Sequence, residues 1–198
     1  TDHGKMFRSN EIGVQNSIDP SLLQYEGRNY LVWGSFRGIY VIELTADGLS
    51  IMPGAKKKRI AGTAFEAVYI HKHGDYYFMF ASIGSCCQGV KSTYKVVVGR
   101  SKKVWGPYKD KTGKPMLKNG YSLVIGANDH FVGNGHGSQI IQDDAGQDWL
   151  LYHGFSRSTP ENGRILLLDQ IKWDQEGWPY VEGGSPSYET QKAPVFNN

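Results

Sequence analysis

Three segments of the sequence are copies of one pattern, and each opens on a residue that can do chemistry. The copies are Asp19–Trp33, Glu66–Phe80 and His136–Tyr152. In the first two, a Gly stands eight residues after the opening acid and a Tyr eleven residues after it. The turn of the third copy is two residues longer, so it is the loosest match. The sequence therefore places an aspartate, a glutamate and a histidine at one repeated position.

Asp19 and Glu66 suit general acid–base chemistry. Glycoside hydrolysis needs two carboxyl groups that flank the scissile bond. One of them is protonated, so that it can donate a proton to the leaving oxygen. A Glu on the wall of a narrow channel has its pKa raised by burial and by a nearby carboxylate, and Asp19 could be that neighbour. The alternative is that each acid only caps a strand end or accepts N–H bonds in a turn. Their matched position in two copies favours chemistry.

His136 lies in a segment of small and flexible residues, Gly133–Ser138, which lets the backbone approach another group closely. One histidine together with water molecules can hold a metal ion. A hydrogen-bonded core histidine is an equal alternative. No helix pattern follows these glycines, so they do not resemble a phosphate-binding loop.

The remaining histidines and the cysteines give no further site. His71 and His73 share one face of a strand end, and without a third ligand we predict a surface position for both. Cys86 and Cys87 are adjacent, and neighbouring cysteines rarely pair because the disulfide strains the intervening peptide. We therefore expect no disulfide framework, and the cysteine count does not decide the cellular compartment.

Short apolar runs predict an all-β chain. Glycine is abundant at 25 residues, aromatic residues make up 13% and charged residues only 21%, which suits short strands joined by tight turns. The runs are rich in β-branched and aromatic residues. The strands are predicted at Tyr30–Trp33, Ile39–Ile42, Tyr76–Phe80, Tyr94–Val98, Asp148–Tyr152 and Ile165–Leu168.

Each repeat continues into further strands, so one copy is a four-stranded blade of a β-propeller. The first strand of each blade lines the central channel, and equivalent residues of successive blades converge there. We predict a β-propeller of which this chain supplies about three blades. The predicted parts are residues 1–15 as the end of an earlier blade, followed by three blades at 16–62, 63–130 and 131–198.

Charge and hydropathy exclude some partners. The formal net charge is +3, from 22 Lys and Arg against 19 Asp and Glu, which is too small to indicate nucleic-acid binding. The one dense basic run, residues 56–59, is interpreted as a solvated turn. No apolar stretch approaches the roughly 18 residues of a membrane span, so no membrane partner is expected.

Seven segments together resemble glycoside hydrolase family 43, and within it the α-1,5-L-arabinanases. This resemblance implies a five-bladed β-propeller, in which residues 16–62 would be blade three, 63–130 blade four and 131–198 blade five. The resemblance spans nearly the whole chain, and the segment from Cys86 to Ser101 favours arabinanases over xylosidases. The other segments are Asn16–Pro20, Gly34–Ile39, Phe65–Ile70, Gly106–Asp110, Gly133–Ser138 and Trp173–Pro179.

The resemblance implies roles for individual residues. Glu66 would be the general acid, and Asp19 would raise its pKa and orient it. Ser35 and Phe36 would help to line the sugar site. His136 would lie beside a hydrated ion, commonly calcium, with no organic cofactor. The reaction would invert configuration at the sugar with water as the nucleophile, and the substrate would be an arabinan polysaccharide or oligosaccharide.

The resemblance also has departures. The family usually has Pro where Val68 stands, and Arg37 replaces a bulkier aromatic residue or a Gly. The family's general base is an Asp of the first blade, and nothing here matches it. We therefore expect the missing N-terminal part of the propeller to supply the base, and this chain alone to be inactive.

Other functions remain open. The alternatives are an α-L-arabinofuranosidase or β-xylosidase of the same family, or a non-catalytic carbohydrate-binding propeller. The substrate class implies a secreted or periplasmic protein, although the sequence contains no signal peptide.

Overall fold

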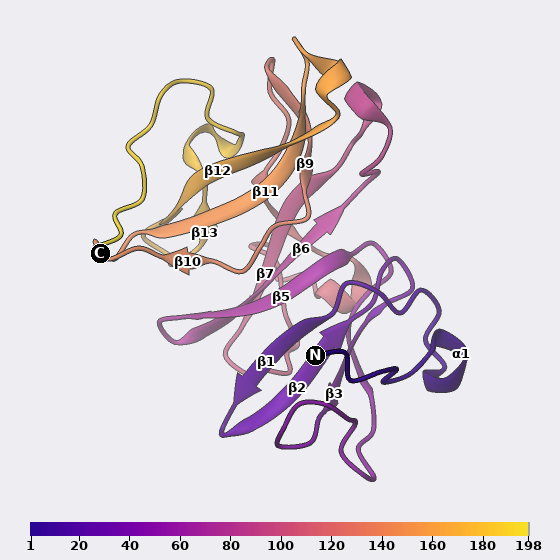
Figure 1. Cartoon of the computed structure of the whole chain (residues 1–198). Helices are drawn as coiled ribbons and strands as arrows, with labels where there is room; N and C mark the ends of the chain where they lie inside the picture. The colour runs from indigo at the N-terminus through magenta and orange to yellow at the C-terminus, as the bar shows by residue number, and fades with distance from the viewer. Residues whose placement is uncertain (198) are drawn as a thin grey trace. The chain divides into compact units, whose positions relative to one another are not determined.

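The computed structural model describes residues 1–197 and confirms the all-β prediction (Figure 1). Its one α-helix among these residues is the four-residue α1, Ser9–Ile12. Four short 3-10 helices lie in the connections. They are η1 Gly89–Lys91, η2 Met116–Lys118, η3 Pro160–Asn162 and η4 Glu182–Gly184.

The first sheet has the strand order β1-β2-β3-β4, and every pair is antiparallel. Its first hairpin turns at Glu26 and Gly27, both with positive φ (49° and 72°). Two such residues in a two-residue loop match the right-handed twist of the flanking strands. The strands are β1 Ser21–Tyr25, β2 Arg28–Trp33, β3 Ile39–Glu43 and β4 Lys58–Ala61.

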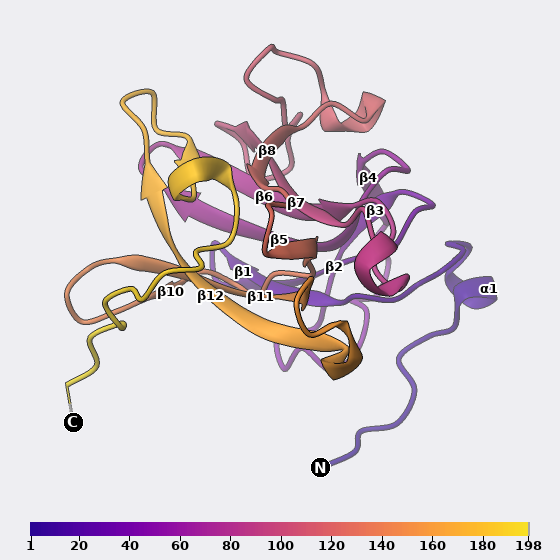
Figure 2. The same cartoon turned by 90° about the horizontal axis from the view of Figure 1, so that it is seen from above.

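The second sheet has the order β5-β6-β7-β8, and its first three strands have seven or eight residues each. Phe78, Met79 and Phe80 on β6 are fully buried. The strands are β5 Glu66–His73, β6 Tyr76–Ile83, β7 Lys95–Ser101 and β8 Ser122–Ile125; Figure 2 shows β8 at the far edge of this sheet.

The third sheet has the order β10-β11-β12-β13, and β9 also pairs with β11. β11 and β12 run side by side as a long antiparallel ribbon in both views (Figures 1 and 2). The strands are β9 Phe131–Gly135, β10 Ile141–Gln142, β11 Asp148–Ser156, β12 Arg164–Trp173 and β13 Pro179–Tyr180.

The chain divides into two compact units, which we describe separately. Residues 1–80 and 99–121 form the first unit, and residues 81–98 with the described chain from 122 onward form the second. β6 and β7 contribute residues to both. No helix among residues 1–197 is long and apolar enough to cross a membrane.

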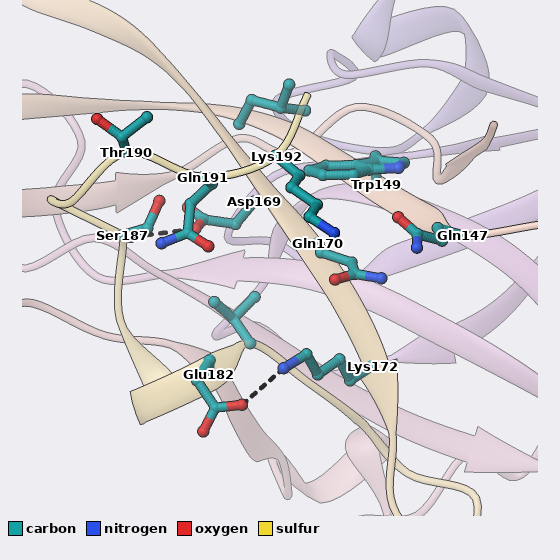
Figure 3. Close-up of a pocket in the computed structure, with 12 residues that line it drawn as sticks. Gln147, Trp149, Asp169, Gln170, Lys172, Glu182, Ser187, Thr190, Gln191 and Lys192 are labelled. Carbon is teal, nitrogen blue, oxygen red and sulfur yellow. Dashed lines mark hydrogen bonds and ion pairs between the residues drawn. The ribbon is translucent and has the colours of Figure 1, made fainter. Parts of the chain in front are cut away.

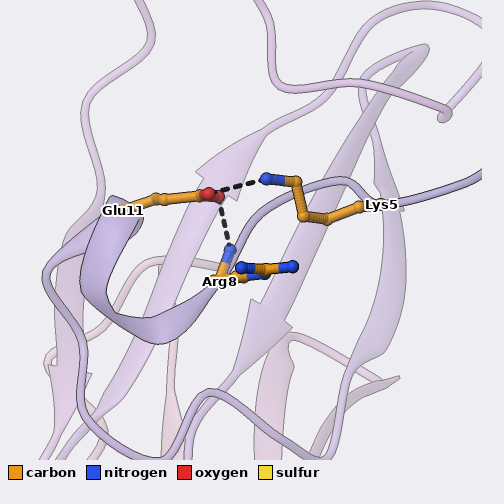
Figure 4. A network of polar contacts seen from close by, with 3 residues as sticks. All are labelled: Lys5, Arg8 and Glu11. Atoms are coloured by element: carbon orange, nitrogen blue, oxygen red, sulfur yellow. Dashed lines mark hydrogen bonds and ion pairs between the residues drawn. The ribbon is translucent and has the colours of Figure 1, made fainter.

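Residues 2–8, part of the segment predicted to end an earlier blade, form no strand in this chain. A strand needs a hydrogen-bonded neighbour, and the described residues offer none to this segment, so it runs as irregular chain into α1. Glu11 of α1 holds the segment that precedes the helix. Its carboxylate accepts hydrogen bonds from Lys5 Nζ at 2.6 Å and from the Arg8 backbone N–H at 2.8 Å (Figure 4). The assignment of residues 1–15 to the end of an earlier blade stays a prediction.

The N-terminal segment instead covers the first sheet. Val14, Trp33 and Ile42 form a buried cluster, and Phe7 packs against Trp33 with ring centroids 5.5 Å apart. Burying such side chains contributes roughly 1.5–3 kcal/mol each. This cluster supports the end of β2, from which the loop at Ser35 begins.

Cys86 and Cys87 form a disulfide with an S–S distance of 2.05 Å, which corrects our expectation that these neighbours would not pair. They lie in the connection between β6 and β7. The Cα atoms are only 3.8 Å apart, the ordinary spacing of adjacent residues, so the bond closes no larger loop. Adjacency made the pairing improbable, but the local loop conformation brings the two sulfur atoms together.

Candidate active site

Asp19 lies two residues before β1 in the first unit, and its side chain holds the start of β5. Its Oδ2 accepts a hydrogen bond from the Ala67 N–H at 3.0 Å. Asp19 and Ala67 both have positive φ, 54° and 50°. Left-handed backbone at non-glycine residues is uncommon and clusters at functional sites. The hydrogen bond therefore joins two residues with strained backbone: Asp19 itself, and Ala67, which directly follows Glu66.

Glu66 is the first residue of β5 and is only 7% exposed. Its Oε2 accepts a hydrogen bond from Ser35 Oγ at 2.7 Å, and Ser35 is 1% exposed. A buried carboxyl group needs polar partners, because leaving it unpaired costs free energy. Ser35, named from the resemblance as a sugar-site residue, therefore contacts the predicted acid directly.

The loop after β2 is fixed to the chain on both sides. The Gly34 N–H donates to the Ile18 carbonyl at 3.0 Å, and the Phe36 N–H donates to the Phe65 carbonyl at 2.9 Å. Asn16 Nδ2 donates to the Ser35 carbonyl at 3.1 Å. This loop therefore links the segments that carry Asp19 and Glu66.

Phe36 is a third non-glycine residue of this site with positive φ, 50°, and its side chain is only partly buried. Such a ring can present an apolar face to a sugar. The structure thus brings together Asp19, Glu66, Ser35 and Phe36 within the first unit.

His136 belongs to the second unit, directly after β9, and is exposed. It also has positive φ, 54°, and its backbone N–H donates to Ser82 Oγ at 2.8 Å. Within this unit its ring stacks on His153, with centroids 6.3 Å apart. The prediction that His136 meets Asp19 and Glu66 at one axis stays a prediction.

His153 was not singled out by the sequence. Its ring lies between those of His136 and Tyr94, and the Tyr94 centroid is 5.7 Å away. Burial, with smaller contributions from the charges of Arg164 and His136, lowers the pKa of His153 to about 4. The ring next to His136 is therefore a neutral imidazole near neutral pH.

The family model for glycosyl hydrolases family 43 matches residues 1–179. The chain belongs to this family. Its first 179 residues include Asp19, Glu66, Ser35, Phe36 and His136.

Curated family 43 relatives are similar over most of this chain. The extracellular exo-α-(1→5)-L-arabinofuranosidase ArbA of Cellvibrio japonicus is 39% identical over an alignment of 184 residues, and the match covers 84% of this chain and 52% of the relative. The extracellular endo-α-(1→5)-L-arabinanase 1 of Bacillus subtilis is 36% identical over an alignment of 186 residues, and the match covers 90% of this chain and 54% of the relative. The chain thus spans about half the length of these relatives.

A solved family 43 structure shows the same architecture. The α-L-arabinanase of Cellvibrio cellulosa, in complex with arabinohexaose, matches with a TM-score of 0.77 and 36% identity over 83% of this chain and 57% of its own. Family 43 arabinanases are five-bladed β-propellers. The predicted fold class and family are both confirmed.

Some features of each unit escaped the sequence prediction. Asn16 was noted only as part of a motif, yet it anchors the Ser35 loop. Ser82 anchors the His136 backbone, and His153 stacks on its ring. Asn16 could have been found, since it lies three residues before Asp19; Ser82 and His153 carry no sequence signal.

The predicted ion finds little support in the second unit. Calcium takes six to eight oxygen ligands, whereas His136 offers an imidazole nitrogen and its stacked neighbour is another imidazole. Nitrogen donors suit transition metals better. These two histidines therefore do not by themselves fit calcium, and the ion stays a prediction.

Proposed function

We propose that the protein containing this chain hydrolyses α-1,5-linked L-arabinan with inversion of configuration. The observation that carries the proposal is the pairing of two acids from successive repeats: Asp19 bonds to the residue next to Glu66, and Glu66 is held by Ser35. The proposal also draws on the relatives, whose names describe cleavage of α-1,5-arabinan.

In this proposal Glu66 donates the proton to the leaving glycosidic oxygen. Ser35 Oγ donates a hydrogen bond to Oε2 of Glu66 and so holds this carboxyl group in place. Asp19 fixes the backbone at Ala67 and so sets the direction in which Glu66 points. Phe36 lines the sugar site.

Inversion also requires a general base on the opposite face of the ring, with the two carboxyl groups about 6.5–9.5 Å apart to admit water. We assign this base to a part of the protein outside these 198 residues. The chain alone should therefore not turn over arabinan.

We also propose that the protein is secreted. Two relatives are named extracellular. The disulfide between Cys86 and Cys87 agrees with this, because disulfides persist mainly in oxidising compartments.

Substrates with different leaving groups test the role of Glu66. Glu66→Gln in the complete protein should lower kcat on linear arabinan by about 10²–10⁴-fold. An aryl arabinofuranoside with a dinitrophenolate leaving group needs no protonation, so its hydrolysis should fall far less.

Glu26→Gln, at an exposed turn of the same unit, is the matched control and should leave both rates unchanged. Equal losses on both substrates, or near-normal turnover of arabinan, would remove Glu66 from the acid role. NMR of the first product formed should show the inverted anomer.

A further inference from the structure

Trp105 belongs to the first unit and lies in the connection that follows β7. The turn around it is held by two hydrogen bonds. The Gly106 N–H donates to the Lys103 carbonyl at 2.9 Å, and the hydroxyl of the buried Tyr108 donates to the Val104 carbonyl. Trp105 itself is partly exposed. A fixed turn therefore presents the indole ring at the surface of the unit.

Trp105 packs against two tyrosines of the first sheet. Its ring centroid lies 4.6 Å from that of Tyr30 on β2 and 5.8 Å from that of Tyr25 on β1. The tyrosines share one sheet face, because Tyr30 pairs with Leu23 and alternate residues of a strand point the same way. Both are partly exposed. We call Tyr25, Tyr30 and Trp105 the aromatic wall.

A cleft of about 190 Å³ lies beside the aromatic wall, with Tyr30, Val41 and Trp105 among its lining residues. Pockets that enclose whole small molecules measure roughly 300–1,000 Å³. The cleft is therefore suited to one ring of a longer chain. Aromatic side chains offer such a ring an apolar face to stack on.

The basic run at residues 56–59 divides into two pairs. Lys57 and Arg59 donate hydrogen bonds to backbone carbonyl groups, at 2.8 Å and 3.0 Å. Lys56 and Lys58 line the cleft instead, and neither makes a hydrogen bond or an ion pair within residues 1–197. Two of the four basic side chains are thus available to a ligand.

The free polar groups of the cleft are hydrogen-bond donors. Glu43 is the one acid among the lining residues, and its Oε1 already lies 3.3 Å from Arg28 Nη1. Trp105 Nε1 makes no hydrogen bond within the described part of the chain. Two ammonium groups and an indole N–H favour a ligand group that is negatively charged and accepts hydrogen bonds. A carboxylate has both properties.

We infer that this cleft binds a uronic-acid unit of an acidic polysaccharide. The aromatic wall takes the apolar face of the sugar ring, and Lys56 and Lys58 bind its carboxylate. A nucleic acid also has rings and negative charge, but neutralising a phosphate backbone takes many cations, whereas the cleft offers two.

The cleft is separate from the site of Ser35 and Glu66. Five residues of mostly extended chain, at roughly 3.3 Å each, separate Tyr30 from Ser35. The inference goes beyond the proposed function and does not depend on it, because binding to this cleft is measured without turnover.

The larger cavity of the second unit lacks an accessible ring (Figure 3). It measures about 440 Å³ and Trp149 lines it, but this side chain is only 5% exposed and its Nε1 donates to Asp143 Oδ2 at 3.0 Å. Lys172 in this cavity is paired with Glu182 at 2.8 Å. This cavity therefore does not combine an exposed aromatic ring with a pair of free cations, as the cleft at Trp105 does.

Isothermal titration calorimetry with two matched ligands tests the role of the carboxylate. The complete protein would be titrated with a galacturonic-acid hexamer and with the methyl ester of that hexamer, which keeps the rings and loses the charge. The free acid should bind about tenfold more tightly or better, and added salt should weaken its binding more than that of the ester. Equal affinities would contradict recognition of a carboxylate.

Lysine variants of equal charge separate the cleft from a general attraction. Lys58→Gln and Lys57→Gln each remove one positive charge at adjacent positions, but only Lys58 lines the cleft. Lys58→Gln should weaken binding of the free acid by about tenfold, and Lys57→Gln should weaken it less than about twofold. Equal losses would show a diffuse attraction and overturn the proposal.

Trp105 variants test the aromatic wall. Trp105→Ala should weaken binding of acid and ester alike by about tenfold, whereas Trp105→Phe keeps a ring and should retain most of the affinity. Thermal unfolding would be measured for each variant, and the lysine pair tests the same cleft with the indole in place. Unchanged binding by a folded Trp105→Ala variant, or tighter binding of a single-stranded oligonucleotide of equal charge, would overturn the proposal.

Discussion

The backbone N–H of Ala67 donates to Oδ2 of Asp19 at 3.0 Å, so the acid of one repeat holds the residue that follows the acid of the next. Both residues are in left-handed backbone conformations. Strained backbone of this kind persists only where the surrounding structure holds it in place, and it is concentrated at functional sites.

Asp19 variants should separate the hydrogen bond from the charge. Asp19→Asn keeps an oxygen acceptor for the Ala67 N–H, so the Tm should change little while kcat on arabinan falls. Asp19→Ala removes the acceptor as well and should lower both. Thermal unfolding and kcat as a function of pH are the measurements, and an Asn variant with normal kcat throughout would show that the charge is not needed.

Ser35→Ala should weaken turnover by removing the donor to Glu66 Oε2. Hydrogen bonds to charged groups contribute about 1.5–3 kcal/mol, which corresponds to about ten- to hundredfold in kcat. KM should change less, because the interaction orients the acid. Ser50→Ala, at an exposed loop position, is the matched control; equal kcat for the two variants would contradict the role of Ser35.

Gly34→Ala should destabilise the loop that carries Ser35. Gly34 has φ +124°, and a Cβ there would lie 2.3 Å from the carbonyl oxygen of Gly38. Gly27 also has positive φ, but a Cβ there would have nothing within 4 Å. Gly34→Ala should therefore lower the free energy of unfolding by about 1–3 kcal/mol more than Gly27→Ala in denaturant titrations. Equal effects would show that the close approach does not matter.

Asp143 should make the C-terminal segment sensitive to acid. Burial acts to raise the pKa of this carboxyl, but hydrogen bonds from the backbone N–H groups of Gln147, Val195 and Ala145 and from Trp149 Nε1 outweigh it and lower the pKa. A folded pKa below the unfolded value of 3.8 contributes stability above pH 3.8, and this stability is lost as the pH falls through the folded pKa.

Asp143→Asn should accordingly lower the Tm at pH 7, and the difference from wild type should shrink below pH 3. Hydrogen exchange at Val195 would report the loosening of the segment. A pH-independent difference would argue against the charge.

Chelation of the protein and a His136→Ala variant together test whether an ion binds at His136. If a hydrated ion binds there, dialysis against a chelator should lower the Tm, calcium should restore it, and His136→Ala should show neither response. His3→Ala, in the exposed N-terminal segment, is the control. An unchanged wild-type Tm after chelation would remove the ion from this site.

The pattern of residues within short segments was enough to predict the strands and the family motifs of this protein. The matched copies at Asp19 and Glu66 predicted blade-like sheets, because a Gly turn and a Tyr at fixed offsets constrain a hairpin without help from distant residues. All six predicted strands correspond to strands of the structure, with boundaries shifted by a few residues. The family motifs around Asp19, Ser35 and Glu66 likewise lie within short segments.

Only the tertiary structure decided how distant residues meet. The bonds from Ser35 to Glu66 and from Ala67 to Asp19 span 31 and 48 positions, and no local pattern encodes a contact of that separation. Residues 2–8 form no strand in this chain because strand pairing depends on a hydrogen-bonded neighbour and not on composition alone. The Cys86–Cys87 bond likewise depends on a loop conformation that the adjacency of the two cysteines does not reveal.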